Sequence, residues 1–443
     1  MAKNDKKIEF DCECVFCKNN KDFEMPEPLV EALLKGKLVV FAGAGISTEV
    51  STVFPVSLYQ DIKDELGIDE KIVFDFPSLM SKYCEEKGRE KLLQKIKERF
   101  DYMNAFPELK RNATRFHEEL SSIFEIKDII TTNWDTFFED NCGALPMVTA
   151  QDFAFWDNPA RKVFKIHGSI NNIGSIIATK EDYAKAYKSL SSGIIGSSLK
   201  LLLATKTVLF VGYSFGDSDF NKIYSFLKKE MGDILPRTYL VTPLKAPDGF
   251  NGTVINTDGT YFVHSLKKRL VEDKKMIDDM RFKGVYTALF SVQEIHNTVS
   301  KINLKENPAV IYCTSYQDGM IHAFERIISL QKTGYYSHVC NIINTIDNYE
   351  ILRKKKVKSR SYFDVAYIDG YLNGISYLWL DDKVRKKVPV FYLYGSGQNI
   401  NNPKLFFRLL KKSPKIHKEA FKLAVEITQK YNSEILHHTP FLY

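Results

Sequence analysis

The feature that most constrains the fold of this chain is a short apolar run that ends abruptly in glycines. Leu38–Ala42 (LVVFA) has no polar side chain and leads directly into Gly43-Ala44-Gly45. Such a run is typical of a strand buried on both faces, as in a parallel sheet covered by helices. Glycines after the strand let the backbone turn tightly and approach a phosphate, with the N-terminus of a following helix as anion site. Many strand-to-helix turns need glycine for geometry alone, and the GxGxxG fingerprint is incomplete here.

Further apolar segments alternate with amphipathic ones along the first 300 residues. The expected strands are Asp128–Thr131, Val163–Ile166, Val208–Val211 and Arg237–Thr242, and the expected helices include Glu27–Lys35, Ser57–Leu66, Arg89–Arg99, Leu190–Ala204 and Val292–Ile302. Strands rich in β-branched and aromatic residues, alternating with helices, predict an α/β fold with a Rossmann-like, doubly wound parallel sheet. In such a sheet, ligands bind beyond the carboxyl ends of the strands.

The residues that could carry chemistry stand directly after these strands. Asn133 and Asp135 follow the second strand. One interpretation makes Asn133 a turn residue and Asp135 a helix cap. In the other, the amide of Asn133 orders a ribose hydroxyl or a water, and Asp135 holds the loop or a neighbouring donor. His167 follows the third strand. A lone histidine is more often structural, but a side chain that titrates near neutral pH at a ligand-facing edge is the best candidate here for a general base or proton relay.

Four motifs in the same order resemble those of the sirtuin family over roughly residues 30–300. They are GAGIS (43–47), TNWD (132–135), KIHGS (165–169) and GYSFGD (212–217). The resemblance implies that the chain binds NAD+ and cleaves its nicotinamide–ribose bond, with Asn133 and His167 as catalytic residues. It also implies that NAD+ is held by a larger set of residues, namely Ala42, Gly43, Ala44, Gly45, Ser47, Thr132, Asp135, Gly212, Ser214 and Asp217.

Two departures from the sirtuin pattern indicate which branch the chain resembles. Protein deacylases of the family carry four zinc-binding cysteines after the HG motif, whereas no cysteine lies between Cys142 and Cys313. Deacylases also follow GAGIS with a GIPDFR-like stretch, and here Ser47–Ser57 reads STEVSTVFPVS. We therefore expect neither zinc nor an acyl-lysine groove.

The segment Ile176–Tyr183 (IIATKEDY) and the GYSFGD motif are similar to those of bacterial antiphage effectors of the Thoeris and Kongming types. That resemblance implies an NAD+ glycohydrolase that forms ADP-ribose and nicotinamide and depletes NAD+. Two alternatives are a non-catalytic regulator that binds NAD+ or ADP-ribose, and an NAD-dependent deacylase or ADP-ribosyltransferase. The missing zinc cysteines argue against the deacylase, and the retained Asn133 and His167 argue against the silent regulator.

Composition narrows the setting in which such an enzyme would work. The formal charge of +7 suits an anionic ligand but is no footprint of nucleic-acid binding, and the densest basic run, Arg353–Lys358, suits a solvated helix end or a partner contact. No apolar run reaches about 18 residues and no secretory signal opens the sequence, so we expect a cytoplasmic protein without a membrane span. Seven scattered cysteines fit a reducing compartment. Cys12, Cys14 and Cys17 could supply only three of the four ligands that a zinc ion needs. We therefore expect them to be free thiols.

We expect three parts in the chain. These are an N-terminal extension (1–25), a sirtuin-like catalytic domain (26–305) and a smaller α/β domain (306–443). In the last part we expect strands at Ala309–Cys313 and Val388–Tyr394 and helices at Met320–Leu330 and Lys415–Lys430. Ser315, Asp318, Gly395 and Gly397 could line a nucleotide pocket there, although a structural turn also accounts for the glycines.

A toxic NADase must be held inactive until it is needed. We therefore expect the last domain to bind an activating nucleotide-type signal or a co-encoded partner protein, such as a nucleotide-processing enzyme. A homo-oligomer or a hetero-complex is the expected assembly.

Overall fold

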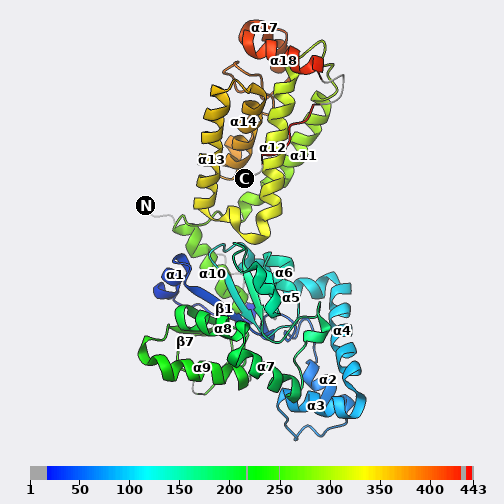
Figure 1. Ribbon diagram of the computed structural model, residues 1–443, viewed down its shortest axis with the longest axis vertical. Coiled ribbons are helices and arrows are strands. Elements are labelled where there is room, and N and C mark those ends of the chain that lie inside the picture. The colour runs from blue at the N-terminus through cyan, green and yellow to red at the C-terminus, as the bar shows by residue number, and fades with distance from the viewer. Residues whose placement is uncertain (1–16, 216–217, 249, 431–435, 442–443) are drawn as a thin grey trace, which may run out of the picture. The chain divides into compact units, whose positions relative to one another are not determined.

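The computed structural model describes residues 17–215, 218–248, 250–430 and 436–441 (Figure 1). The chain divides into two compact units, Met1–Arg269 and Leu270–Tyr443. Within the described residues, no helix is long and apolar enough to cross a membrane. Cys12, Cys14 and Asp217 lie outside the described residues.

A seven-stranded sheet, parallel throughout, organises the first unit. The strands are β1 (Leu38–Ala42), β2 (Asp128–Thr131), β3 (Leu145–Met147), β4 (Lys162–Lys165), β5 (Thr207–Val211), β6 (Thr238–Val241) and β7 (Thr253–Ile255). Their order is β3-β4-β2-β1-β5-β6-β7. The chain thus starts at the centre, builds one half of the sheet, and returns to the other side of β1 to build the second half. This confirms the doubly wound fold and places its switch point beside β1.

Both faces of the sheet are covered, which explains the uninterrupted apolar sequence of β1. All five residues of β1 are buried. One face packs on α8 (Ile194–Thr205) and α9 (Ser218–Met231). On the other face, a Cβ built on Gly259, the first residue of α10 (Gly259–Glu272), would lie 2.5 Å from Val211 of β5. Each large apolar side chain buried in this way contributes roughly 1.5–3 kcal/mol.

Among the described residues, seven further helices belong to this unit, and three of them pack together in a group of their own. The seven are α1 (Glu27–Leu34), α2 (Leu58–Glu65), α3 (Phe76–Lys87), α4 (Arg89–Ala105), α5 (Pro107–Ser121), α6 (Phe137–Cys142) and α7 (Lys180–Ser192). Ser57 and Asp75 cap α2 and α3 by accepting hydrogen bonds from Gln60 N and Ser78 N. Helices α2, α3 and α4 share an apolar cluster of their own, which includes Ile62, Leu79 and Ile96.

Three local expectations for the first unit were wrong. The helix expected at Leu190–Ala204 is two helices, because Gly193 takes an extended conformation between α7 and α8. Strands β3 and β7 were not predicted. Both have only three residues, and β7 lies in a segment whose Gly, Asn and Asp content is typical of a loop.

The second unit is helical, so the α/β fold expected for residues 306–443 was wrong. Its helices are α11 (Met280–Val299), α12 (Val310–Leu330), α13 (Val339–Lys358), α14 (Tyr362–Ser376), α15 (Asp382–Arg385), α16 (Pro403–Leu410), α17 (Ser413–Ile416) and α18 (Lys418–Lys430). The supposed strand Ala309–Cys313 is the start of α12, which is buried around most of its circumference. Such a helix lacks an amphipathic period and reads like a buried strand. Val388–Tyr394 contributes only an isolated bridge between Phe391 and Ile400.

The division between the units also comes earlier than the expected 305/306 boundary. Phe282, Val285 and Val292 of α11 share one core cluster with α12 and α14, so α11 belongs to the helical unit rather than closing the catalytic one. The basic run Arg353–Lys358 forms the last turns of α13, in agreement with the helix-end interpretation.

Two of the four residues suggested for a nucleotide pocket are buried in the interior of this unit. Ser315 is buried and donates a hydrogen bond to the carbonyl oxygen of Phe363, and Asp318 is buried among histidines. Gly395 and Gly397 have φ angles of 81° and 62°, in agreement with a structural turn.

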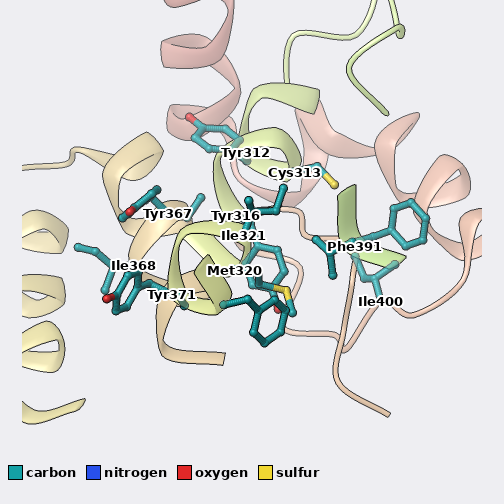
Figure 2. Packing of buried hydrophobic residues seen from close by; sticks show 14 of the residues in the cluster. Tyr312, Cys313, Tyr316, Met320, Ile321, Tyr367, Ile368, Tyr371, Phe391 and Ile400 are labelled. Carbon is teal, nitrogen blue, oxygen red and sulfur yellow. The ribbon is translucent and has the colours of Figure 1, made fainter. Parts of the chain in front are cut away.

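Close contact between α12 and α14 holds the helical unit together. Large side chains such as Tyr316, Tyr367 and Tyr371 fill the core on either side of the contact (Figure 2). At the contact itself both helices carry glycine. A Cβ on Gly319 would lie 2.0 Å from the carbonyl oxygen of Tyr367, and one on Gly370 would lie 1.8 Å from that of Tyr316. Backbone therefore packs on backbone, and no larger residue fits there.

Gly370→Ala is expected to destabilise the helical unit by about 3 kcal/mol, because one methyl group would force two buried helices apart. Urea unfolding followed by circular dichroism measures the loss. Gly174→Ala is the control, because a Cβ there would lie 3.8 Å from Asn172 Oδ1, at an ordinary contact distance. Equal stability of the two variants would contradict the close contact.

A buried histidine predicts how the first unit responds to acid. Burial lowers the pKa of His117 from its ordinary 6.5 to about 4, and its ring packs against Phe137 and Phe138. Below pH 6.5 His117 binds a proton in the unfolded chain, whereas in the folded chain it binds this proton only as the pH approaches 4. Stability should therefore fall between pH 6.5 and 4, by on the order of 3 kcal/mol in total.

His117→Met is expected to remove this part of the acid dependence, measured as the free energy of unfolding against pH. His264→Met, at a side chain that is 62% exposed, serves as the control. An unchanged slope in His117→Met would show that the ring is not the source of the effect.

Candidate active site

Loops at the carboxyl ends of the central strands enclose a cavity of about 930 Å³ in the first unit. This volume lies in the range of small-molecule and cofactor sites. Most residues predicted for the site line it: Gly43, Ala44, Gly45, Thr132, Asn133, His167, Gly212 and Ser214. Ala42, Ser47 and Asp135 are buried beside the cavity without being among its lining residues. Ser47 and Asp135 are connected to Asn133 by hydrogen bonds.

The loops after β1 and β5 interlock across the switch point. Gly43 N donates to the carbonyl oxygen of Val211 and Gly45 N to that of Gly212, both at 3.0 Å. A Cβ on Gly43 would lie 2.4 Å from Gly212 O, and Gly212 itself has a φ of 61°. The glycines are needed because two backbones touch here. The helix expected after them is a single 3-10 turn, Ala44–Ile46, so the loop has no α-helical N-terminus.

The amide of Asn133 links the loops after β1 and β2. Its Nδ2 donates to Gly43 O at 3.2 Å and to Ser47 Oγ at 3.3 Å, while its backbone N–H donates to Thr131 Oγ1 at 3.0 Å. Because Nδ2 faces a carbonyl oxygen, the orientation of the amide is fixed. Its Oδ1 is buried and has no hydrogen-bond partner among the described residues. An acceptor is thus left available in a residue that lines the cavity.

Asp135 serves both of the roles weighed for it. Its Oδ2 accepts a hydrogen bond from Ser47 Oγ at 3.2 Å, which ties the loop after β2 to the loop after β1. Its Oδ1 accepts from the N–H of Phe137, the first residue of α6, at 3.2 Å. The carboxylate therefore satisfies the first N–H of α6, whose N-cap residue is Thr136, and holds a loop.

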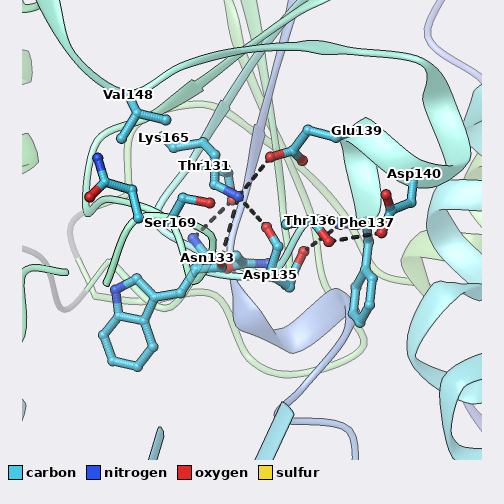
Figure 3. Close-up of polar contacts among 12 residues, drawn as sticks. Thr131, Asn133, Asp135, Thr136, Phe137, Glu139, Asp140, Val148, Lys165 and Ser169 are labelled. Carbon is cyan, nitrogen blue, oxygen red and sulfur yellow. Dashed lines mark hydrogen bonds and ion pairs between the residues drawn. The ribbon is translucent and has the colours of Figure 1, made fainter. Parts of the chain in front are cut away.

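A buried lysine supports the loop that carries Asn133 (Figure 3). The side chain of Lys165 is fully buried; its Nζ donates to the carbonyl oxygens of Asp135 and Trp134 and pairs with Glu139 at 3.0 Å. Burial raises the pKa of Glu139, and the ammonium of Lys165 opposes that shift. The KIHGS motif contains this lysine, but its position on a strand gave no indication that it would hold the neighbouring loop.

A tight turn that requires glycine fixes His167 just beyond the end of β4. The imidazole is buried and packs edge-on against Tyr183, with ring centroids 5.0 Å apart. Gly168 has a φ of 85°, and a Cβ there would lie 2.1 Å from Ser175 O. The carbonyl oxygen of His167 accepts a hydrogen bond from Ile177 N at 3.0 Å, so the turn is closed by the segment that leads to Tyr183.

Several lining residues were not singled out from the sequence. They include Glu49, Phe76, Arg115, Trp134, Tyr183 and Asp258. Burial raises the pKa of Glu49, and Arg99 opposes the shift. Asp258 accepts hydrogen bonds from the N–H groups of Thr260 and Tyr261 at the start of α10. Asp258 follows β7, so a prediction of that strand would have made Asp258 a candidate site residue. Phe76 and Arg115 lie on helices, and no sequence spacing marks them as site residues.

Comparison with known proteins agrees with this geometry. A model of the SIR2-like domain matches residues 127–257. The NAD(+) hydrolase ThsA of Enterococcus faecium is 32% identical over 356 residues, which cover 76% of this chain and 72% of that protein. The NAD(+) hydrolase ThsA of Cytobacillus dafuensis is 32% identical over 46% of this chain and 40% of its own length. Defense-associated sirtuin 2 of Bacillus subtilis is 21% identical over 66% of this chain and 29% of its own length.

Lys165→Met is expected to destabilise the first unit by roughly 3–5 kcal/mol, because it leaves the Glu139 carboxylate buried without a cation. Denaturant unfolding measures the loss, and Lys165→Met combined with Glu139→Gln should recover part of it. Lys185→Met, which breaks an exposed pair with Glu181, is the control and should change stability by less than about 1 kcal/mol. Equal effects of the two single variants would rule out a supporting role for Lys165.

Proposed function

Because the chain belongs to the SIR2-like family that includes the NAD(+) hydrolase ThsA of Enterococcus faecium, we propose that it is an NAD+ glycohydrolase. It converts NAD+ and water to ADP-ribose, nicotinamide and a proton, and so depletes NAD+ in bacterial antiphage defence. The observation that carries this proposal is that Asn133, whose amide oxygen has no hydrogen-bond partner among the described residues, and His167 line one cavity at the switch point of the sheet.

The fixed amide of Asn133 suits the reacting ribose. Its nitrogen is occupied by Gly43 O and Ser47 Oγ, which leaves Oδ1 as the atom of the amide without a hydrogen bond among the described residues. Oδ1 accepts hydrogen bonds and would take one from a ribose hydroxyl or from the attacking water. An acceptor held before the substrate arrives places that group without further loss of freedom, which is worth orders of magnitude in rate.

His167 provides the proton transfer that the reaction needs. When the glycosidic bond breaks, its electron pair stays on the nicotinamide nitrogen, which becomes neutral, and positive charge develops on the ribose. Water then adds to the anomeric carbon and loses a proton. An imidazole in the same cavity can take that proton, directly or through a ribose hydroxyl. The turn at Gly168 keeps the ring in place for this step.

The rest of the cavity suits the diphosphate and the second ribose. The interlocked loops bring Ala44 and Ser214 to its wall, and Arg115 adds a cationic side chain at the lining. A guanidinium matches the two-oxygen geometry of a phosphate. Thr242 and Asp258, beyond β6 and β7, offer polar groups on the other side of the switch point, where dinucleotide-binding sheets receive the second half of their ligand.

The helical unit is proposed to control the enzyme, as a sensor of a nucleotide-type signal or a docking site for a partner or another copy. Large apolar side chains on two of its helices support this role: Met280 and Phe290 of α11 are 62% and 66% exposed, and Ile351 of α13 is 67% exposed. Burial of these side chains in an assembly would contribute to its stability.

Asn133→Ala and His167→Ala are each expected to lower the rate of nicotinamide release about 10²- to 10⁴-fold, because positioning and proton transfer each contribute on that scale. Release is measured with a fluorescent NAD+ analogue, with and without lysate from infected cells so that an activating signal can be supplied. NAD+ binding by each variant is measured in parallel, to separate a lost step from a lost site.

His264→Ala is the matched control for these variants, since that ring is mostly exposed on α10 and does not line the cavity. It should hydrolyse NAD+ at the rate of the unaltered chain. Unaltered rates in Asn133→Ala and His167→Ala would exclude the assigned roles. Binding of NAD+ with no turnover under any condition would instead favour a nucleotide-binding regulator.

A further inference from the structure

A cluster of two histidines and an aspartate lies in the helical unit, outside the proposed NAD+ site. His296 comes from α11, Asp318 from α12 and His437 from the C-terminal segment. It is the one group of three potential ligands found close enough together to hold a metal ion in the part of the chain that the structure describes. The aspartate and His296 are buried, whereas the side chain of His437 is 54% exposed.

The three ligand atoms form a nearly equilateral triangle. His296 Nε2 lies 3.4 Å from His437 Nδ1 and 3.5 Å from Asp318 Oδ1, and His437 Nδ1 lies 3.2 Å from Asp318 Oδ1. Tetrahedral Zn²⁺ with bonds of about 2.0–2.1 Å requires ligand atoms about 3.3–3.4 Å apart. The triangle therefore matches one face of a zinc tetrahedron.

The surrounding hydrogen bonds prepare these atoms as ligands. Gln317 Nε2 donates to Val390 O at 2.8 Å, which leaves Gln317 Oε1 as an acceptor for His296 Nδ1 at 3.2 Å. In the neutral ring, the proton then sits on Nδ1 and the lone pair of Nε2 faces the triangle. An outer partner of this kind is the usual way a zinc-binding histidine is oriented.

The carboxylate is held in the same manner. Asp318 Oδ2 accepts a hydrogen bond from the backbone N–H of His438 at 2.7 Å, which leaves Oδ1 toward the two imidazoles. Two neutral imidazoles and one carboxylate make a borderline donor set that suits Zn²⁺ among the common divalent ions. We propose that His296, Asp318 and His437 bind one Zn²⁺ ion, with the fourth coordination position left to solvent on the side of His437.

Such an ion would fasten the end of the chain to the core of the helical unit. Asp318 and His437 are 119 residues apart in sequence, so the ion would close a long loop and join α11, α12 and the C-terminal segment. Because no preformed site exists in the unfolded chain, the binding free energy would add to folding stability. The site is independent of NAD+ hydrolysis, and its test does not depend on that activity.

The primary experiment is a zinc titration of the full chain carrying Cys12→Ser, Cys14→Ser and Cys17→Ser, which removes competing thiolates at the N-terminus. The metal-free protein is titrated with ZnCl₂ by calorimetry, and thermal unfolding is recorded with and without Zn²⁺. One Zn²⁺ per chain and a higher unfolding temperature are expected. With Co²⁺, visible ligand-field bands should appear without a thiolate charge-transfer band. A chain that takes up no Zn²⁺ would overturn the proposal and leave the cluster as a hydrogen-bonded network.

Variants then locate the ion. His437→Ala changes a half-exposed side chain and should leave the fold intact. It should abolish both the binding of Zn²⁺ and the thermal shift. Gln317→Met should weaken binding roughly 10- to 100-fold, as loss of an outer-shell partner does. His322→Gln is the matched control, because His322 bonds Tyr367 and lies outside the triangle. Binding that is unchanged in His437→Ala, or weakened as much in His322→Gln, would overturn the assignment.

Discussion

The site depends on direct contact between two loop backbones at the centre of the sheet. Gly43 and Gly45 of the loop after β1 touch Gly212 of the loop after β5, at distances that exclude a Cβ on either side. That contact sets where the backbone can run above β1, and with it the position of Gly43 O. This oxygen is one of the two acceptors that fix the Asn133 amide. The orientation of a proposed catalytic residue after β2 thus follows from the absence of side chains at the glycines after β1 and β5.

Buried charge provides the second constraint. An ammonium such as that of Lys165 is costly to remove from water, and it repays the cost only if its hydrogen bonds are satisfied. Two backbone carbonyls from the Asn133 loop and the Glu139 carboxylate satisfy them. The loop therefore cannot move away without removing two hydrogen bonds from a buried cation. These contacts of Lys165 keep the loop that carries Asn133 in place, as the proposed reaction of NAD+ with water requires.

The sequence predicted the sheet and most of the cavity because both carry local signals. Five of the seven strands are marked by apolar composition, and the motif residues stand directly after them, where parallel topology brings them to one edge. Strands β3 and β7 are too short to carry such a signal. The supporting roles of Lys165 and Glu139 could not be predicted either, since they arise from a contact between a strand and a helix 26 residues apart in sequence.

The helical unit was harder to predict for a physical reason. The first half of α12 is buried on all sides and so has no polar face and no 3.6-residue period, and Ala309–Cys313 therefore resembled a strand. Burial is also the reason why the cluster around Asp318 could not be recognised from the sequence. Asp318 lies in the middle of that helix, and its partners come from positions 296 and 437, with no common spacing. The absence of the sirtuin zinc cysteines indicated nothing about such a cluster, because that argument concerned a different part of the chain. A metal site built from three distant elements becomes visible only when the helices are placed, and this is why it lies outside every sequence motif.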